Sequence, residues 1–553
     1  MRVLGAAIGN CVHVAGVYRF LSLAEEEGHE ILFLGPAVSL ERLFKEIESF
    51  DPDIIGVSYR LTTESAIPLL ADLKNCIFER KLEKKRWLLG CTASIKPVAE
   101  SLGFFEEIFT GFSTDEDTHA FLRGHSSKKA EERFPQDVIS RITRKTPIPI
   151  LRHHFGLPSL EDTIEGVEMI ADAAVLDVIS VGPDQDAQQS FFRPREMTDI
   201  STGDGGVPLR SMDDLERIFQ ATRRGNFPLL RCYSGTRDLL RWARMLKDTI
   251  NTAWCATPLV WYSELDGRSS RTLEAAIREN KMNHEWHARH GIPVEVNESH
   301  HWSLRSAHDT IAVAMAFLAA YNAKAAGVHT YIAQYMLNTP LGLSPKMDLA
   351  KMLAKIELIE SLNDHRFQSI RQVRPGLFSF PPDLDNAKGQ LAASVYTGML
   401  LEPQIVHVVS FTEASHVANA NDVIESCRIS SRVIHNCTLG NINPNQDIEV
   451  RQRKEELVRE ANLLIRAIAT FAPEDSRNPL VEPETYVGAI KAGVLDAPHL
   501  SSNTIARGKL QTRLINGACY AINPETHEPM NEIIRLEKLG IILFPDIKRN
   551  SVF

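Results

Sequence analysis

Residues able to bind a ligand follow several apolar runs near the start of the chain. They are Cys11, His13, Gly16, Ser58, Gly90 and Gly111. An imidazole or a hydroxyl can bind a ligand directly, and a glycine lets the backbone approach one closely. If these runs are parallel strands, their ligand lies in the loops beyond the strand ends. The pattern therefore predicts a ligand site in the first quarter of the chain.

A second group of candidate residues lies further along the chain: Arg231, Tyr262, Arg268, His300 and Glu413. An arginine at the end of a strand is suited to a planar, two-point grip on a carboxylate, which favours an acidic substrate. We expect His300 and His301 to lie in a strand and to face opposite ways. Only one of them would then enter the site, as a hydrogen-bonding or acid–base group.

Each candidate also has a structural interpretation. Arg231 could be an ion-pair partner, and Tyr262 and Arg268 could form part of a barrel rim. Glu413 could cap the helix that follows it. His13 could be an ordinary loop histidine.

Three further histidines, His284, His287 and His290, are three residues apart. They lack the HExxH order of a zinc protease, and we expect them to form the end of a surface helix rather than a metal site.

Composition excludes several classes of protein. The chain has 553 residues, 44% apolar and 24% charged, which is typical of a globular protein of several domains. The net charge of −10 disfavours nucleic-acid binding. No apolar run is long enough to span a membrane. The eight cysteines are scattered without a CxxC pair, which predicts reduced thiols in the cytoplasm. A homodimer is possible on these numbers.

The first 125 residues alternate short apolar runs with amphipathic segments. The alternation predicts an α/β domain with a doubly wound parallel sheet. Expected strands are 2–9, 30–36, 53–61, 86–94 and 106–112, and expected helices are 14–28, 40–50 and 64–82. Residues 126–149 are polar and charged and are predicted to be a linker.

The same alternation continues over residues 150–470, which predicts a (β/α)8 TIM barrel. Its site would lie at the carboxyl ends of the strands. Strands are expected at 175–182, 227–235, 253–261, 292–299, 328–335 and 405–411, and helices at 236–250, 271–280, 308–327 and 345–362. Residues 471–553 are predicted to form a small C-terminal α+β extension.

The N-terminal landmarks resemble the flavodoxin-like cobalamin-binding domains of mutases and methionine synthase. Those domains carry Asp-x-His-x-x-Gly after the first strand, then a Ser, a Gly-Gly pair and a further Gly after later strands. The resemblance implies that His13 ligates the cobalt of cobalamin, that Ser58 binds the displaced nucleotide base, and that Gly16, Gly90 and Gly111 line its slot. Here Cys11 replaces the Asp, Cys91 the second Gly, and Arg60 the Leu after the Ser.

Residues 150–430 resemble the catalytic subunit of glutamate mutase (methylaspartate mutase), through LLRCYSGTRDLLRWA, WYSELDGRSSRTLEAAI and IVHVVSFTEASHVANANDVIES. The resemblance implies that Arg231 grips a substrate carboxylate, that Tyr262 contacts the substrate, that Arg268 lies near a family lysine, and that Glu413 contacts the adenosyl ribose. The glutamate that binds the substrate amine in that family is Ala256 here, and a lysine is Val409. The segment NESHHWSL replaces NREPFGPL, which introduces His300.

Together the two resemblances imply an adenosylcobalamin-dependent radical mutase, an isomerase acting on a small carboxylate or amino acid that need not be glutamate. The alternatives are a cobalamin-dependent methyltransferase and a non-catalytic cobalamin-binding protein.

Overall fold

The computed structural model describes residues 1–110, 118, 121–122, 134–197 and 202–542. The chain forms two compact units, residues 1–133 and 134–553. Gly111, predicted to line the N-terminal ligand site, lies outside the described residues.

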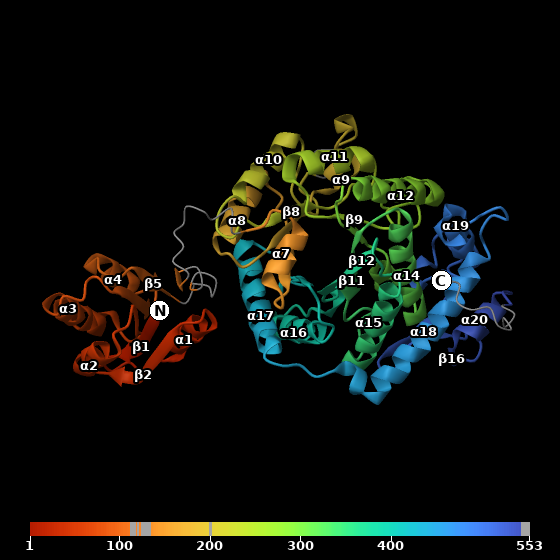
Figure 1. The fold of residues 1–553 in the computed structure, drawn as a ribbon. Coiled ribbons are helices and arrows are strands. Elements are labelled where there is room, and N and C mark those ends of the chain that lie inside the picture. The colour runs from red at the N-terminus through yellow and green to blue at the C-terminus, as the bar shows by residue number, and fades with distance from the viewer. Residues whose placement is uncertain (111–117, 119–120, 123–133, 198–201, 543–553) are drawn as a thin grey trace. The chain divides into compact units, whose positions relative to one another are not determined.

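The first unit is a five-stranded parallel sheet with helices on both faces (Figure 1). Its strand order β2-β1-β3-β4-β5 is that of flavodoxin-like folds, which confirms the predicted fold. The strands are β1 Arg2–Ile8, β2 Glu30–Val38, β3 Ile54–Tyr59, β4 Arg86–Cys91 and β5 Glu107–Phe109, and the helices are α1 Ala15–Glu26, α2 Leu40–Phe50, α3 Thr63–Glu79 and α4 Lys96–Leu102.

Two glycines let α1 lie directly on the sheet. A Cβ built at Gly5 would be 2.7 Å from a methyl carbon of Leu21, and one at Gly56 would be 2.8 Å from the ring of Phe20. Strand β3 is buried along its whole length because helices cover both faces. This close packing determines where the β1–α1 loop, with His13, meets the sheet.

The second unit contains eight parallel strands in a nearly closed barrel. Seven neighbouring pairs run β8-β7-β6-β13-β12-β11-β10-β9. Between β8 and β9, the backbone N–H of Ala253 donates to the carbonyl of Leu230 at 2.8 Å. The predicted TIM barrel is confirmed. The strands are β6 Ile150–Phe155, β7 Val178–Val181, β8 Leu229–Cys232, β9 Cys255–Thr257, β10 Val294–Val296, β11 Thr330–Met336, β12 Gln368–Arg374 and β13 Ile405–His407.

Helices surround the barrel, as the alternating pattern predicts (Figure 1). They are α7 Val138–Lys145, α8 Leu160–Asp172, α9 Gln185–Ser190, α10 Met212–Ala221, α11 Leu239–Ile250, α12 Leu273–Arg289, α13 Ser299–Leu304, α14 Asp309–Ala325, α15 Pro345–Glu360, α16 Leu384–Met399 and α17 Ala420–Thr438. Helix α7 lies inside the range expected to be a linker and belongs to the second unit.

The C-terminal segment covers α14 and α15 on the outside of the barrel (Figure 1). It consists of α18 Ile448–Ala469, α19 Pro483–Ala492, α20 Glu532–Lys538 and an antiparallel sheet of β14 Thr512–Ile515, β15 Ala518–Ile522 and β16 Pro529–Met530. Because α18 packs on it, α14 is buried on nearly all sides, which explains its apolar sequence.

One end of the barrel interior is apolar. Ile150, Val178, Leu229, Ile332 and Ile405 come from the amino-terminal halves of their strands and form one buried cluster with Trp254. Polar side chains follow further along the strands. Above this apolar floor, polar side chains line a cavity at the carboxyl ends of the strands, where barrel sites lie.

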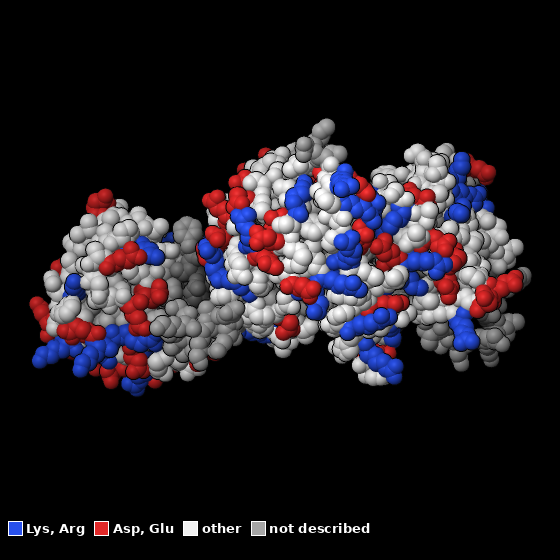
Figure 2. Space-filling view, turned by 90° about the horizontal axis from the view of Figure 1, so that it is seen from above, with Lys and Arg blue, Asp and Glu red and all other residues white. Residues whose placement is uncertain are grey.

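The surface carries charges of both signs. Figure 2 shows Lys and Arg interspersed with Asp and Glu over the visible face of the second unit. Among the described residues, no helix combines the length and the apolar character needed to cross a bilayer.

We expect the apolar floor to stabilise the barrel strongly. Ile332→Ala removes a fully buried side chain and should lower the free energy of unfolding by about 2–5 kcal/mol. Ile533→Ala, at a position that is 52% exposed, should change it by less than about 0.5 kcal/mol. Urea unfolding followed by tryptophan fluorescence compares the two variants, and equal midpoints would contradict the assignment of the floor.

Candidate functional site

His13 lies on an ordered loop between β1 and α1. The N–H of Cys11 donates to the carbonyl of Ile8 at 3.2 Å, and the N–H of Ala37 donates to the carbonyl of Cys11 at 2.9 Å. Cys11 is fully buried, and its Sγ lies 3.8 Å from Nδ1 of His13. The imidazole itself is exposed, and its Nε2 makes no hydrogen bond to a described residue. This nitrogen is therefore open to a ligand, with a thiol on the opposite side of the ring.

A cavity of about 210 Å³ lies next to this loop, between α1 and the carboxyl ends of β3 and β4. Gly16, Ser58 and Gly90 all line it. Gly90 is paired with Ser58 across the sheet. Ser58 is 2% exposed, and its hydroxyl makes no hydrogen bond to a described residue. The structure thus brings together three predicted residues around a slot between α1 and the carboxyl ends of β3 and β4.

Buried charges occupy the middle of the barrel. Nε1 of Trp254 donates to Glu295 at 2.8 Å, and guanidinium nitrogens of Arg152 and Arg231 lie 3.5 and 3.7 Å from the same carboxylate oxygen. Nε and Nη2 of Arg231 are buried and have no partner among the described residues. Arg231 is therefore both the ion-pair partner of the structural interpretation and a donor with unused capacity.

A cavity of about 610 Å³ opens at the carboxyl ends of β6, β12 and β13. Its lining includes His154, Tyr233, Arg374, His407 and Glu413. Burial and the neighbouring arginines hold the pKa of His154 and of His407 well below the usual range, so both imidazoles are neutral. Partial enclosure raises the pKa of Glu413, and Arg374 opposes that shift.

The loop after β9 carries Tyr262 and Arg268. The guanidinium of Arg268 lies 4.2 Å from the centre of the Tyr262 ring, and its Nη2 donates to Gln188 at 3.3 Å. The ring of His301 meets that of Tyr262 edge-on at 5.6 Å. These groups form a second polar cluster, and Tyr262 takes a left-handed φ of 60° to reach it.

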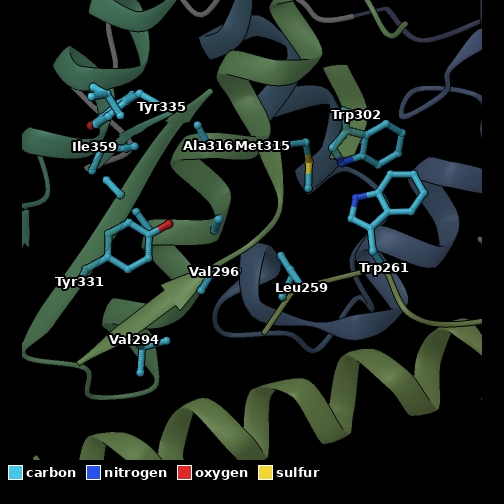
Figure 3. Close-up of a cluster of buried hydrophobic side chains, with 14 of the residues drawn as sticks. Leu259, Trp261, Val294, Val296, Trp302, Met315, Ala316, Tyr331, Tyr335 and Ile359 are labelled. Carbon is cyan, nitrogen blue, oxygen red and sulfur yellow. The ribbon is translucent and has the colours of Figure 1, made fainter. Parts of the chain in front are cut away.

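Glu298 anchors this loop from the neighbouring strand end. It accepts hydrogen bonds from the N–H groups of Leu259 and Val260 at 2.8 and 3.1 Å, and from Nε1 of Trp302 at 2.8 Å. Figure 3 shows Trp261 and Trp302 side by side, with ring centres 4.8 Å apart. Burial raises the pKa of Glu298 to about 7.

The predicted strand through His300 and His301 is wrong. The strand ends at Val296, and both histidines lie in α13 with ring centres 4.5 Å apart and both buried. Glu298 and the two tryptophans hold the chain in a helical turn there, so the alternation of a strand does not apply. His300 Nδ1 pairs with Nε2 of Gln334 at 2.9 Å.

The predicted surface position of His284 and His287 is also wrong. Both are buried on α12, at 0% and 2% exposure, because that helix packs against β9, α14 and α19. His290 is exposed. Among the described residues no cluster of metal-ligating side chains is present.

Several groups in the barrel site were not predicted. Arg152 and His154 lie on β6 and Arg374 on β12, the two strands that the apolar pattern missed. Both strands read as polar (ILRHHF and QSIRQVR) because His154 and Arg374 line the cavity near their carboxyl ends, and because Arg371 of β12 pairs with Glu360 of α15. A count of strands would have found them, since six expected strands cannot close an eight-stranded barrel.

Comparison with known proteins bears mainly on the second unit. Residues 305–538 match the family of the methylaspartate mutase E chain (MutE), which confirms the resemblance of the barrel over that part. A solved cobalamin-binding protein from Desulfitobacterium hafniense DCB-2 matches at 20% identity, over 23% of this chain and 59% of that chain, with a TM-score of 0.20. That TM-score carries no argument about fold or ligand. No curated protein matches the chain.

Lys355 on α15 is a fully buried amine. Burial lowers the pKa of this fully enclosed amine to about 7, and Lys351 adds to the shift. A depressed pKa contributes stability that is present above the unfolded value of 10.5 and is lost as pH falls through 7.

We therefore expect the stability of the native chain, measured against Lys355→Met, to rise by about 1 kcal/mol per pH unit between pH 7 and 9. Urea unfolding at pH 7, 8 and 9 measures the difference. Lys491→Met, at an exposed position, is the matched control and should show no such slope. Parallel curves for the native chain and Lys355→Met would refute the prediction.

Proposed function

We propose that the protein is an adenosylcobalamin-dependent carbon-skeleton mutase of the cytoplasm that acts on a small carboxylate or amino acid. The observation that carries the proposal is Arg231, a buried guanidinium with two unused donors inside a barrel. The last three strands of that barrel and the C-terminal segment match the methylaspartate mutase E chain. A buried arginine with free donors suits a carboxylate, because a two-point contact satisfies both N–H groups.

The first unit fits a cobalamin. An exposed imidazole nitrogen beside a slot matches what the cofactor needs when its own base leaves the metal. His13 would ligate cobalt through Nε2, and the Cys11 thiol would orient the ring in place of the usual carboxylate. The free hydroxyl of Ser58 would hydrogen-bond the base in the slot beside Gly16 and Gly90.

The bound cofactor would supply a carbon-centred radical able to remove hydrogen from a substrate. The chain's own residues bind and orient that substrate. Arg231 would hold a carboxylate inside the barrel. Glu413 lines the cavity of about 610 Å³, whereas Tyr262 and Arg268 form a separate cluster on the loop after β9. The apolar floor and the surrounding strands exclude water, which protects a reactive species from side reactions.

Spectroscopy tests the role of His13. With the chain labelled with ¹⁵N-histidine and loaded with Co(II) cobalamin, we expect the electron paramagnetic resonance signal to show splitting from one ¹⁵N nucleus. His13→Ala should remove that splitting, whereas His365→Ala, at an exposed position of the barrel unit, should retain it. A persistent ¹⁴N pattern would mean that the cofactor keeps its own base, and would exclude this ligation.

A screen of small carboxylic and amino acids with adenosylcobalamin tests the reaction. We expect one of them to give an organic radical signal and an isomerised product. Arg231→Ala should lower kcat/KM by about 100-fold or more, because a two-point contact with a charged group is lost. Arg231→Lys should retain part of the activity, and Arg366→Ala, at an exposed position, all of it. Turnover that is unchanged in Arg231→Ala would contradict the assigned substrate contact.

A further inference from the structure

Arg152 contacts the imidazoles of His154 and His407, two residues that line the cavity of about 610 Å³ at the carboxyl ends of the barrel strands. Its Nη2 lies 2.7 Å from Nε2 of His154 and 3.3 Å from Nε2 of His407. The two histidine rings meet edge-on, with centres 4.7 Å apart. Strand pairing explains the arrangement, since His407 on β13 is directly beside Arg152 on β6, and His154 follows two residues later on the same face.

The arginine determines where each histidine carries its proton. A guanidinium only donates hydrogen bonds. Burial and Arg231 lower the pKa of Arg152 only to about 9, so it stays charged at neutral pH. The Nε2 atom of each imidazole must therefore accept, and the single proton of each neutral ring lies on Nδ1. The hydroxyl of Tyr233, 2.8 Å from Nε2 of His154, can donate to this bare nitrogen as well.

Three buried N–H donors at this end of the barrel have no partner among the described residues. Nδ1 of His154, Nδ1 of His407 and Nε of Arg374 are all buried, and none has a hydrogen-bond partner among the described residues. All three residues line the cavity of about 610 Å³. Leaving a buried donor unpaired costs free energy. All three unpaired donors belong to residues that line one cavity, where an acceptor on a ligand could pair with them.

The charge balance favours an acidic ligand without an amino group. Glu295 is the shared counter-charge of three guanidinium groups. Arg152 and Arg231 form ion pairs with it, and Arg374 is attracted to it electrostatically. The indole of Trp254 also donates a hydrogen bond to it. The charge of Arg374 lowers the pKa of Glu413 and so opposes the effect of its burial. Ala256, paired with Glu295 across the sheet, offers no carboxylate. An ammonium group would thus meet positive charge and N–H donors.

We propose that Arg152 fixes His154 and His407 as Nδ1–H tautomers, so that with Arg374 they bind a carboxylate of the substrate, and that this site selects a dicarboxylic acid lacking an ammonium group. The inference rests on the proposed function in treating the ligand as the substrate. The tautomers and the selectivity are both measurable on the full chain without added corrinoid.

Nitrogen NMR of the ¹⁵N-histidine-labelled chain reports the tautomers. Signals of His154 and His407 are assigned by their loss in His154→Asn and His407→Asn. We expect a protonated Nδ1 and a bare Nε2 in both rings. Arg152→Met should allow the Nε2–H tautomer in both rings. An unchanged circular dichroism spectrum would show that this variant is still folded. An Nε2–H tautomer in the native chain would overturn the inference.

Calorimetry with matched acids tests the ligand class. Glutarate should bind at least about tenfold more tightly than L-glutamate, which differs only by its ammonium group. Asparagine places an amide N–H where Nδ1 lies, whereas leucine fills the space without a donor. We therefore expect His407→Asn to keep glutarate affinity within about threefold and His407→Leu to lose about tenfold.

Equal binding of the two acids, equal effects of the Asn and Leu variants, or no glutarate binding by the native chain would each overturn the ligand assignment. These results are independent of the cobalt spectrum. If they fail while His13 ligates cobalt, the error lies in the anion site. If they hold while His13 does not ligate, the error lies in the proposed cofactor.

Discussion

Glu295 is the counter-charge around which the polar part of the barrel is arranged. Two arginines from β6 and β8 reach its carboxylate, and Trp254 donates to it from the edge of the apolar floor. A buried carboxylate of this kind is stable only with such partners. Its removal would leave Arg152 and Arg231 as uncompensated buried charges. The same carboxylate also positions Arg152 against His154 and His407. The proposed tautomers of these two histidines therefore depend on the ion pair between Arg152 and Glu295.

The C-terminal segment holds this arrangement from outside. Asp309 at the start of α14 lies 3.4 Å from Lys351 of α15 and 3.3 Å from Arg453 of α18, and it accepts the N–H of Cys519 in β15. One buried carboxylate therefore joins four elements. The family match covers this segment together with the last three strands of the barrel, which agrees with their forming one packed structure. Residues 471–542 extend this cover rather than forming a separate core.

In the first unit, the thiol of Cys11 lies beside Nδ1 of His13. The Cys11 sulfur is fully buried and 3.8 Å from the ring, a longer and weaker contact than a carboxylate hydrogen bond. The His13 ring is thus less firmly oriented than a carboxylate would hold it. The slot near this loop combines small residues such as Gly16, Ser58 and Gly90 with the larger side chains of Phe20 and Phe109.

The sequence by itself determined the two α/β architectures, because apolar runs that are buried on both faces alternate with amphipathic helices at a spacing that allows only parallel sheets. It also placed His13, Ser58 and Gly90 at strand ends, and Arg231 at the end of a barrel strand. Only the tertiary structure decided the rest. Strands β6 and β12 are polar because they face a site, so no apolar period marked Arg152, His154 or Arg374. His300 and His301 form a helical turn because Glu298, on a different segment from the loop it anchors, holds the chain there. Contacts between residues far apart in the chain leave no local pattern, and the proton positions at the barrel mouth depend on such contacts.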